Sequence, residues 1–314
     1  MGRIVFNIGA SANDNTGTPL RDTGDFLNRM SYDVYRDISR FYDLNAFTVS
    51  DYDDLYAHES QILCKRLTDR TVMFVLYTSD KVTKAERALT AHCILKVFEL
   101  TTMSLLKTID LFYCGLVAGL TQPADEPQTA PRMYISGTTL RCFVGVESAL
   151  YNRDIDISNT DPSTWTAGNL TIEQMTMKDA GGNDVTVNVT PANIQAHLEY
   201  TLGEINVLYN NLAPWFRNLD RITVDASGNW YSILELSNEL GAGTTNMAML
   251  VRSTDDGVSW TFHSLVGYTT TARTRILEAS VVLIGTTFHV INRTSGSVIN
   301  RYSSDDDGAT WVNN

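Results

Sequence analysis

Hydrophobic and polar positions alternate along much of the chain after residue 70, as expected of β-strands that bury one face. Apolar runs rich in β-branched and aromatic residues occupy 71–77, 93–100 and 105–113. The polar residues 101–104 separate the last two runs and predict a hairpin. A helix over 84–113 is the competing interpretation, but its apolar residues do not share one clear face. We therefore predict strands.

The beginning of the chain has a different pattern. Residues 1–21 are dominated by Gly, Asn, Asp and Ser, which predicts loop and turn. From about Asp22, apolar residues recur every three or four positions, as one face of a helix requires. This stripe comprises Leu27, Met30, Val34, Ile38 and Phe41. Such a helix either packs on its own domain or intertwines with its copies in a homotrimer.

An eight-residue pattern, Ser-x-Asp-x-Gly-x-Ser/Thr-Trp, occurs twice near the end of the sequence. The two copies begin 51 residues apart, within the range of one propeller blade. Their pattern residues are Ser253, Asp255, Gly257, Ser259 and Trp260, and then Ser304, Asp306, Gly308, Thr310 and Trp311. We expect the Asp to accept backbone N–H groups across a tight turn and the Gly to adopt a positive φ. The Trp would start the next strand and pack between neighbouring repeats.

This pattern resembles the Asp-box of sialidase-type (BNR) β-propellers. The resemblance implies a mainly β fold, built of propeller-like Asp-box repeats of about 50 residues. In that family the boxes lie at the periphery of the blades, away from the ligand face. The motif therefore predicts architecture more strongly than sialidase chemistry.

Degenerate copies of the repeat occur upstream. Gly137-Thr-Thr-Leu mirrors Gly285-Thr-Thr-Phe, and the segment 158–165 keeps the Ser, Thr and Trp of a box. Thr160 and Pro162 replace its Asp and Gly. Trp165 precedes Trp260 by 95 residues, close to two periods, so we expect a divergent blade between 166 and 220. The period gives about five blades over 70–314.

Two local signals add to this framework. Thr190, Pro191 and Gly203 predict the start and end of an inserted helix. Asp225-Ala-Ser-Gly228 predicts a hairpin turn. The sequence stops three residues after Trp311. Either the strand at 71–77 completes the last blade by ring closure, or the sequence is part of a longer protein.

The first 35 residues resemble the N-terminal segment common among baseplate, tail-fibre and tailspike proteins of tailed bacteriophages. The matching residues are Ile8, Gly9, Asn13, Asp14, Thr16, Gly17, Leu20 and Arg21, followed by Leu27, Asn28 and Tyr35. Asn15, Thr18, Phe26, Met30 and Ser31 depart from the family pattern, mostly in its helical part. The resemblance implies an anchor that inserts a trimeric adhesin or baseplate protein into the virion.

Composition narrows the possible partners. The net charge of −12 argues against a nucleic-acid partner, which requires a basic face. The longest apolar stretch, 111–120, is too short to cross a bilayer, so we predict no membrane insertion. Cys64, Cys93, Cys114 and Cys142 contain no Cys-x-x-Cys pair, and we expect buried free thiols.

Candidate chemistry is sparse. Sialidase-type hydrolysis requires an arginine cluster, a Tyr nucleophile activated by Glu, and an Asp acid/base. Arg221-Ile222-Thr223 resembles the family's Arg-Ile-Pro strand, but Thr replaces Pro, so we assign no catalytic residue. Each box already uses one Asp of its acidic group, and we predict neither a metal nor a cofactor.

Aromatic side chains are the remaining candidates. Trp215, Trp230 and Tyr231 either stack on sugar rings at a propeller face or pack between blades.

We predict an anchor over 1–45, a linker over 46–69 and a propeller-like domain over 70–314. The leading hypothesis is a structural virion protein of a phage tail, made in the host bacterial cytoplasm. It would be a homotrimer that contacts other tail or baseplate proteins and presents its propeller for tail assembly or for binding host-surface polysaccharide. The alternatives are a sialidase-like or depolymerising glycosidase tailspike and a bacterial BNR-repeat binding protein.

Overall fold

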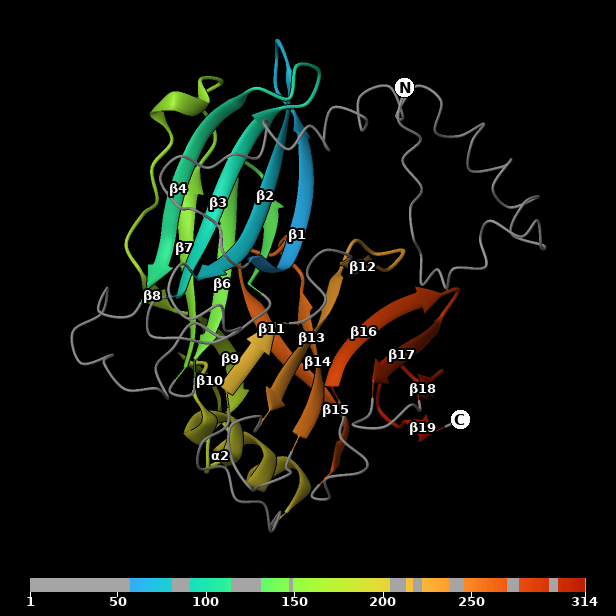
Figure 1. The fold of residues 1–314 in the computed structure, drawn as a ribbon. Coiled ribbons are helices and arrows are strands. Elements are labelled where there is room, and N and C mark those ends of the chain that lie inside the picture. The colour runs from blue at the N-terminus through green and yellow to red at the C-terminus, as the bar shows by residue number, and fades with distance from the viewer. Residues whose placement is uncertain are drawn as a thin grey trace, which may run out of the picture.

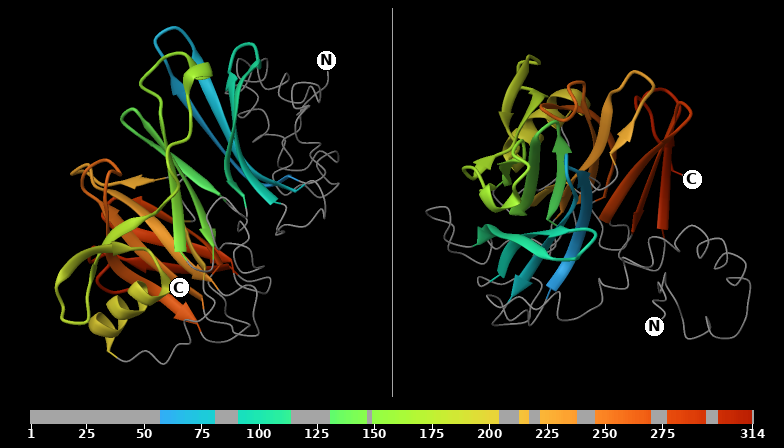
Figure 2. Two further views of the ribbon diagram at one scale, coloured as in Figure 1. Left: turned by 90° about the vertical axis from the view of Figure 1, so that its left-hand side faces the viewer. Right: turned by 90° about the horizontal axis from the view of Figure 1, so that it is seen from above.

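Four sheets follow one another in chain order, arranged as propeller blades (Figures 1 and 2). The computed structural model describes residues 57–80, 91–113, 131–146, 149–203, 213–216, 222–237, 246–269, 277–293 and 299–313. The first sheet consists of β1 (Ala57–Arg66), β2 (Thr71–Asp80), β3 (Ala91–Glu99) and β4 (Leu105–Tyr113). The second consists of β5 (Arg132–Ser136), β6 (Thr139–Val146), β7 (Ala149–Asp156) and β8 (Thr171–Ile172). The predicted mainly β, propeller-like fold is confirmed.

The third sheet is larger because an insertion joins its edge. Its main strands are β11 (Ala213–Phe216), β13 (Trp230–Ser237), β14 (Asn246–Ser253) and β15 (Trp260–Thr269), and β12 (Thr223–Val224) also pairs with β13. The hairpin of β9 (Gln174–Lys178) and β10 (Asp184–Asn188) adds to β15, and β9 runs parallel to it. The fourth sheet consists of β16 (Leu277–Ile284), β17 (Thr287–Arg293), β18 (Ile299–Ser304) and β19 (Val312–Asn313).

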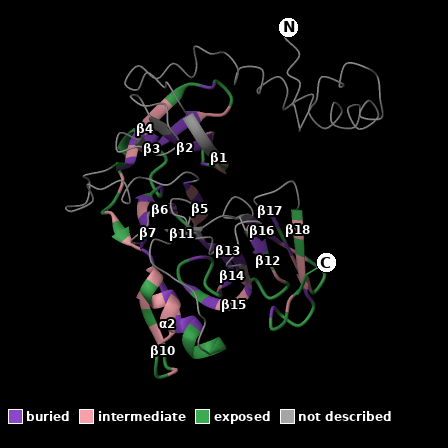
Figure 3. Ribbon diagram, turned by 60° about the horizontal axis from the view of Figure 1, so that its bottom comes forward, coloured by how far each residue is buried: buried purple, intermediate pink, exposed green. Residues whose placement is uncertain are grey.

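Each sheet packs face to face on the next through an apolar cluster. Alternation along the strands produces this arrangement, since successive side chains point to opposite faces. Representative contacts are Phe74 with Trp165 between the first and second sheets, Phe143 with Leu234 between the second and third, and Tyr231 with Phe288 between the third and fourth. Figure 3 shows buried residues, in purple, on strands of the sheets and on α2.

The insertion continues into α2 (Pro191–Leu202), which confirms the predicted helix. The Thr190 hydroxyl accepts the Asn193 N–H at 3.3 Å, and Gly203 ends the helix with φ 82°. Ile194 and Leu198 are buried in the cluster between the second and third sheets. The ring of His197 lies 3.9 Å from that of Phe262. Its Nδ1 accepts the Lys178 N–H at 2.7 Å. Burial lowers the pKa of this imidazole to about 4, so it is neutral at physiological pH.

The predicted strands and the hairpin at 225–228 are confirmed as β2, β3, β4 and the turn between β12 and β13. Three other predictions were wrong: the linker over 46–69, the divergent blade between 166 and 220, and ring closure by 71–77. The region 46–69 is not only a linker, because β1 occupies Ala57–Arg66 and pairs with β2. The described residues between 166 and 220 form no separate blade; they supply β8, the inserted hairpin, α2 and β11. The 95-residue interval between Trp165 and Trp260 is therefore one period enlarged by an insertion.

Ring closure by 71–77 was also wrong. These residues lie in β2, between β1 and β3 of the first sheet, and β19 is the fourth strand of the last sheet. The estimate of about five blades becomes four among the described residues. The anchor motif at 8–35 and the whole segment 1–45 lie outside the described residues.

The strand connections divide between two ends of the sheets. At one end, the connections at 67–70, 100–104, 137–138, 157–170, 254–259, 285–286 and 305–311 are all described. We call it the box end, because both Asp-box turns lie there. The other stretches between strands, at 81–90, 114–130, 147–148, 204–212, 217–221, 238–245, 270–276 and 294–298, lie outside the described residues.

Candidate functional site

The first Asp-box is a closed network of local hydrogen bonds. The Ser253 hydroxyl donates to Asp255 Oδ1 at 2.7 Å and accepts the Gly257 N–H at 2.8 Å. The same carboxylate accepts the Ser259 N–H at 2.9 Å and the Ser259 hydroxyl at 2.5 Å. The predicted structural role of these box residues follows directly from these bonds.

The second box repeats the first. The Ser304 hydroxyl donates to Asp306 Oδ1 at 2.7 Å and accepts the Gly308 N–H at 2.8 Å. Thr310 donates to Asp306 through its N–H at 2.9 Å and its hydroxyl at 2.6 Å. Gly257 and Gly308 both have φ 82°, as the turn requires. Hydrogen bonds from Thr310 lower the pKa of Asp306 to about 2.

The tryptophan of each box attaches the turn to the preceding sheet. Trp260 Nε1 donates to the Tyr134 hydroxyl at 3.0 Å, and Trp311 Nε1 donates to the Ser264 hydroxyl at 3.2 Å. Trp165 lies between β7 and β8, where the degenerate box was predicted, and its ring stacks on Phe74 at 5.8 Å. The degenerate box has lost its Asp and Gly, but its Trp still packs on the preceding sheet.

A buried polar cluster lies between the second and third sheets beside the first box. Arg141 forms a bidentate ion pair with Asp154, at 2.8 and 2.9 Å, and its Nη1 lies 3.6 Å from Glu173 Oε1. Asn152 donates to Glu173. The Tyr134 hydroxyl donates to the Gly257 carbonyl at 2.5 Å. We call these five side chains, Tyr134, Arg141, Asn152, Asp154 and Glu173, the interface cluster.

Burial dominates the electrostatics of Glu173 and Tyr134 in the interface cluster. Desolvation raises the pKa of Glu173 to about 7, although Arg141 and Asn152 oppose the shift. Burial also raises the pKa of Tyr134. Tyrosine, glutamate and arginine are the residue types that sialidase chemistry uses. Here, however, the tyrosine hydroxyl is held by a backbone carbonyl and an indole, so the cluster joins two sheets and leaves no position for a substrate.

Sequence reasoning missed the interface cluster. Its members come from β5, β6, β7 and the residue after β8, so no motif connects them. The available signal was Arg141 and Asp154 on neighbouring strands, and it becomes useful only when the register of β6 and β7 is known.

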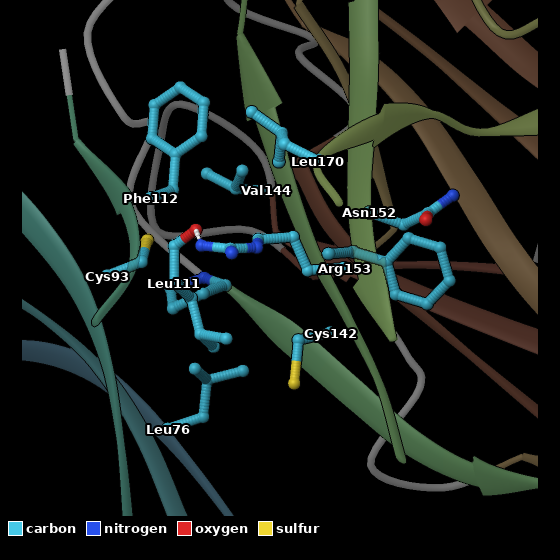
Figure 4. A pocket seen from close by; sticks show the side chains of 11 residues that line it. Leu76, Cys93, Leu111, Phe112, Cys142, Val144, Asn152, Arg153 and Leu170 are labelled. Atoms are coloured by element: carbon cyan, nitrogen blue, oxygen red, sulfur yellow. Dashed lines mark hydrogen bonds between the residues drawn. The ribbon is translucent and has the colours of Figure 1, made fainter. Parts of the chain in front are cut away.

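A second candidate is a small pocket between the first and second sheets, with a cavity volume of about 10 Å³. Figure 4 shows the Arg153 guanidinium directed at Leu111, with Cys93 and Cys142 among the lining residues. Arg153 donates to the carbonyls of Asp110, Leu111 and Gly168 at 3.3, 3.0 and 2.9 Å. The pocket is below the usual 300–1,000 Å³ of ligand sites, and its cation already has three acceptors.

The thiols here are not reactive sites. Burial raises the pKa of Cys93 to about 12 and also raises that of Cys142, which disfavours thiolates. The prediction of buried free thiols is confirmed for these two and wrong for Cys64, which is exposed. Cys114 lies outside the described residues.

The predicted glycan-contacting aromatics do not gather into one site. Tyr231 is only 2% exposed; its ring packs on Phe288 at 4.7 Å and its hydroxyl donates to Asp225 at 3.1 Å. It therefore packs between the third and fourth sheets, which corrects its assignment as a glycan contact. Trp230 is half-buried at the box end, edge-on to Tyr134. Trp215 lies on β11, but its side chain is outside the described part, as is Arg221.

Two general tests concern only the described residues. Within that part of the chain, no group of three or more His, Cys, Asp or Glu side chains is placed to hold a metal ion. Across the same residues, no helix is long and apolar enough to cross a membrane.

Comparison with known proteins supports the architecture. No family model matches the sequence, and no curated protein resembles it in sequence. Among solved structures, the Hadza microbial sialidase Hz136 is similar over 84% of this chain, with a TM-score of 0.52 and 10% identity. This chain covers 47% of that sialidase, about half its length.

Two other solved structures are less similar. The Trypanosoma rangeli sialidase has a TM-score of 0.47 and 14% identity, over 82% of this chain and 38% of that protein. The α-L-arabinofuranosidase CtGH43 from Clostridium thermocellum has a TM-score of 0.35 and 12% identity, over 81% of this chain and 71% of that protein. At these identities, the likeness concerns the fold alone.

Proposed function

We propose that this chain is a glycan-binding β-propeller and that the end of the sheets opposite the box end contacts the sugar. The observation that carries the proposal is the structural commitment of the box end. At the box end, the turns are committed to structural contacts: both boxes saturate their own polar groups, and their tryptophans attach to the preceding sheet. Binding residues in scaffolded folds lie mainly on connections. We therefore assign sugar binding to the end opposite the box end.

The likeness to a sialidase fold supports a sugar as the ligand class, since that protein acts on a glycan. The resemblance of the first 35 residues to phage tail anchors supports a place in a virion, with the propeller displayed toward the host surface. A homotrimer would convert weak single contacts into avidity. Contacts with other tail or baseplate proteins would then involve residues 1–45.

A glycan array probed with the full chain tests this function. We expect binding to a subset of glycans, and we expect Tyr113→Ala, at the opposite end of β4, to weaken it, because this aromatic side chain is exposed there. The matched control is Val258→Glu at the box end, where the side chain is 64% exposed, and it should bind normally. Loss of binding in the control, with binding kept in Tyr113→Ala, would contradict the proposal.

Glycoside hydrolysis is the second candidate, and the sialidase-like fold favours it. Incubation with a fluorogenic sialoside and with host polysaccharide distinguishes the two functions. Binding without released sugar supports a recognition module. Sugar release by the full chain would make the protein a glycosidase, whose catalytic groups would then have to be sought outside the interface cluster.

Virion attachment has its own test. Light scattering of the full chain should give about three times 34.9 kDa, and deletion of 1–45 should abolish incorporation into tails. A monomer that never associates with virions would contradict this part while leaving glycan binding intact.

A further inference from the structure

Among the described residues, one face of the fourth sheet has no other sheet packed on it. In β17, Phe288 and Val290 point to the third sheet and are buried, whereas Ile291 and Arg293 point away and are exposed. Strand register places Ile291 opposite Arg301, and Arg293 opposite Ile299. Ile284, Ile291 and Ile299 are 63%, 46% and 70% exposed. We define the outward face by Ile284, His289, Ile291, Arg293, Ile299 and Arg301; Figure 3 shows exposed residues along β18.

The other three sheets indicate what this kind of face does. Each has a face directed toward the following sheet, and each such face is buried against that sheet. The outward face is the structural equivalent in the last sheet, and three β-branched side chains remain exposed on it. Exposed aliphatic residues that occur singly are ordinary, but a group on one flat sheet face is typical of an interaction surface.

Charge indicates the chemistry of the partner. The outward face carries His289, Arg293 and Arg301, and Arg301 Nη2 lies 3.1 Å from His289 Nδ1. The whole chain, in contrast, has 36 acidic and 24 Lys or Arg residues, a net charge of −12. A basic patch on a protein of negative net charge attracts the predominantly acidic surface of another copy. Two outward faces placed against each other would bring arginines together, so the contact should be head to tail.

We propose that the outward face of the fourth sheet binds an acidic surface of a second copy of this chain, in a head-to-tail contact within the oligomer. The inference rests on the homo-oligomer of the proposed function and names the surface that makes the contact. Isoleucine side chains supply the apolar burial, and the arginines supply orientation and a dependence on salt.

The test is size-exclusion chromatography with light scattering on the full chain. We expect a wild-type mass that is a multiple of 34.9 kDa and at least tenfold weaker association for the double variant I291E/I299E. Arg301→Glu should weaken association at low salt more than at high salt. Val258→Glu, equally exposed but at the box end of the third sheet, is the matched control and should keep the wild-type mass.

The outcomes separate the two levels of the proposal. A wild-type monomer at all concentrations would overturn the oligomer, and with it this contact. A wild-type oligomer whose mass is unchanged in both I291E/I299E and Arg301→Glu would overturn only the surface assigned here. Circular dichroism and the melting temperature of each variant should match wild type, because the substituted side chains lie outside the core.

Discussion

The same Asp-box lies over two quite different interfaces. The first box lies beside the interface cluster, where Arg141, Asp154 and Glu173 are packed between sheets. The second lies beside an apolar interface, where Tyr231 packs on Phe288. Both boxes nevertheless make the same internal bonds, and both are held by a side chain of the preceding sheet. Tyr134 donates to the Gly257 carbonyl, and His263 Nε2 lies 2.7 Å from the Asp307 carbonyl. The box is therefore a self-contained turn. The preceding sheet contributes only one donor to a box carbonyl and one hydroxyl that accepts the N–H of the box tryptophan.

The largest expected effect comes from removing the box tryptophans. Trp260→Ala should destabilise the protein by about 3–5 kcal/mol, because a fully buried ring leaves a cavity. Trp311 is only partly buried, so Trp311→Ala should cost less. Urea denaturation of both variants measures the difference. Equal losses would mean that the two interfaces depend equally on their boxes.

Substituting the box glycines should have the next largest effect. A Cβ on Gly257 would lie 2.8 Å from the Tyr134 ring and 2.9 Å from the Trp230 ring, at φ +82°. We expect Gly257→Ala to cost about 1–3 kcal/mol for overpacking, in addition to backbone strain. At Gly308 the nearest atom is the Ser264 hydroxyl at 3.0 Å, which can move, so Gly308→Ala should cost less. Thermal melting checks the order, and a larger loss for Gly308→Ala would contradict it.

Glu173 makes the polar interface sensitive to pH. Its folded pKa of about 7 exceeds its ordinary value of 4.5, so the folded state binds more protons between these pH values. Stability should therefore fall as pH rises through this window and level off above it. The expected loss between pH 5 and 8 is about 2 kcal/mol.

Denaturation of wild type and Glu173→Gln at pH 5 and pH 8 measures this effect. The amide cannot ionise, so the variant should lose this part of the pH dependence. A wild-type stability that is independent of Glu173 over this range would show that the carboxylate is well solvated or well paired in the folded state.

The smallest effect concerns the box aspartates. Hydrogen bonds from Thr310 lower the pKa of Asp306, and the pKa of Asp255 is also lowered, although burial opposes the shift there. Each carboxylate therefore adds stability above its ordinary pKa, and this stability is lost as pH falls toward the folded value. Asp306→Asn and Asp255→Asn should each lower the melting temperature slightly at pH 7, and the difference from wild type should shrink in acid. A difference that grows in acid would contradict the assignment.

Structure that depends on interactions between residues close in the sequence could be predicted, and structure that depends on distant residues could not. The boxes were predictable because their internal bonds connect residues at most four positions apart. The helix at α2 was predictable because its cap and ending are local. In contrast, β1 was missed because its pattern is inverted: Gln61 is buried and Ile62 is exposed. The Gln61 amide donates to the Met133 carbonyl at 2.9 Å and accepts the Met133 N–H at 2.6 Å. This partner is 72 residues away and cannot be inferred from local alternation.

The same limit applies to the candidate site. Tyr231 was predicted to contact a glycan because adjacent aromatic residues occur both at exposed sugar-binding surfaces and in interfaces between sheets. Only the position of the fourth sheet, where Tyr231 packs on Phe288, distinguishes the two cases. The interface cluster needed the register of three strands. The divergent blade expected between 166 and 220 was inferred from the interval between tryptophans alone. An insertion lengthens this interval without adding a repeat.

The parallel pairing of β9 with β15 has a consequence for the order of events during synthesis. Met175 pairs with Trp260, so the inserted hairpin leaves the ribosome well before the strand that it joins. At the usual 5–20 residues per second, the delay is on the order of 10 s. Throughout this interval, the edge of β9 and the apolar side of α2 await their partners. We expect a chaperone that shields nascent chains to act on this segment.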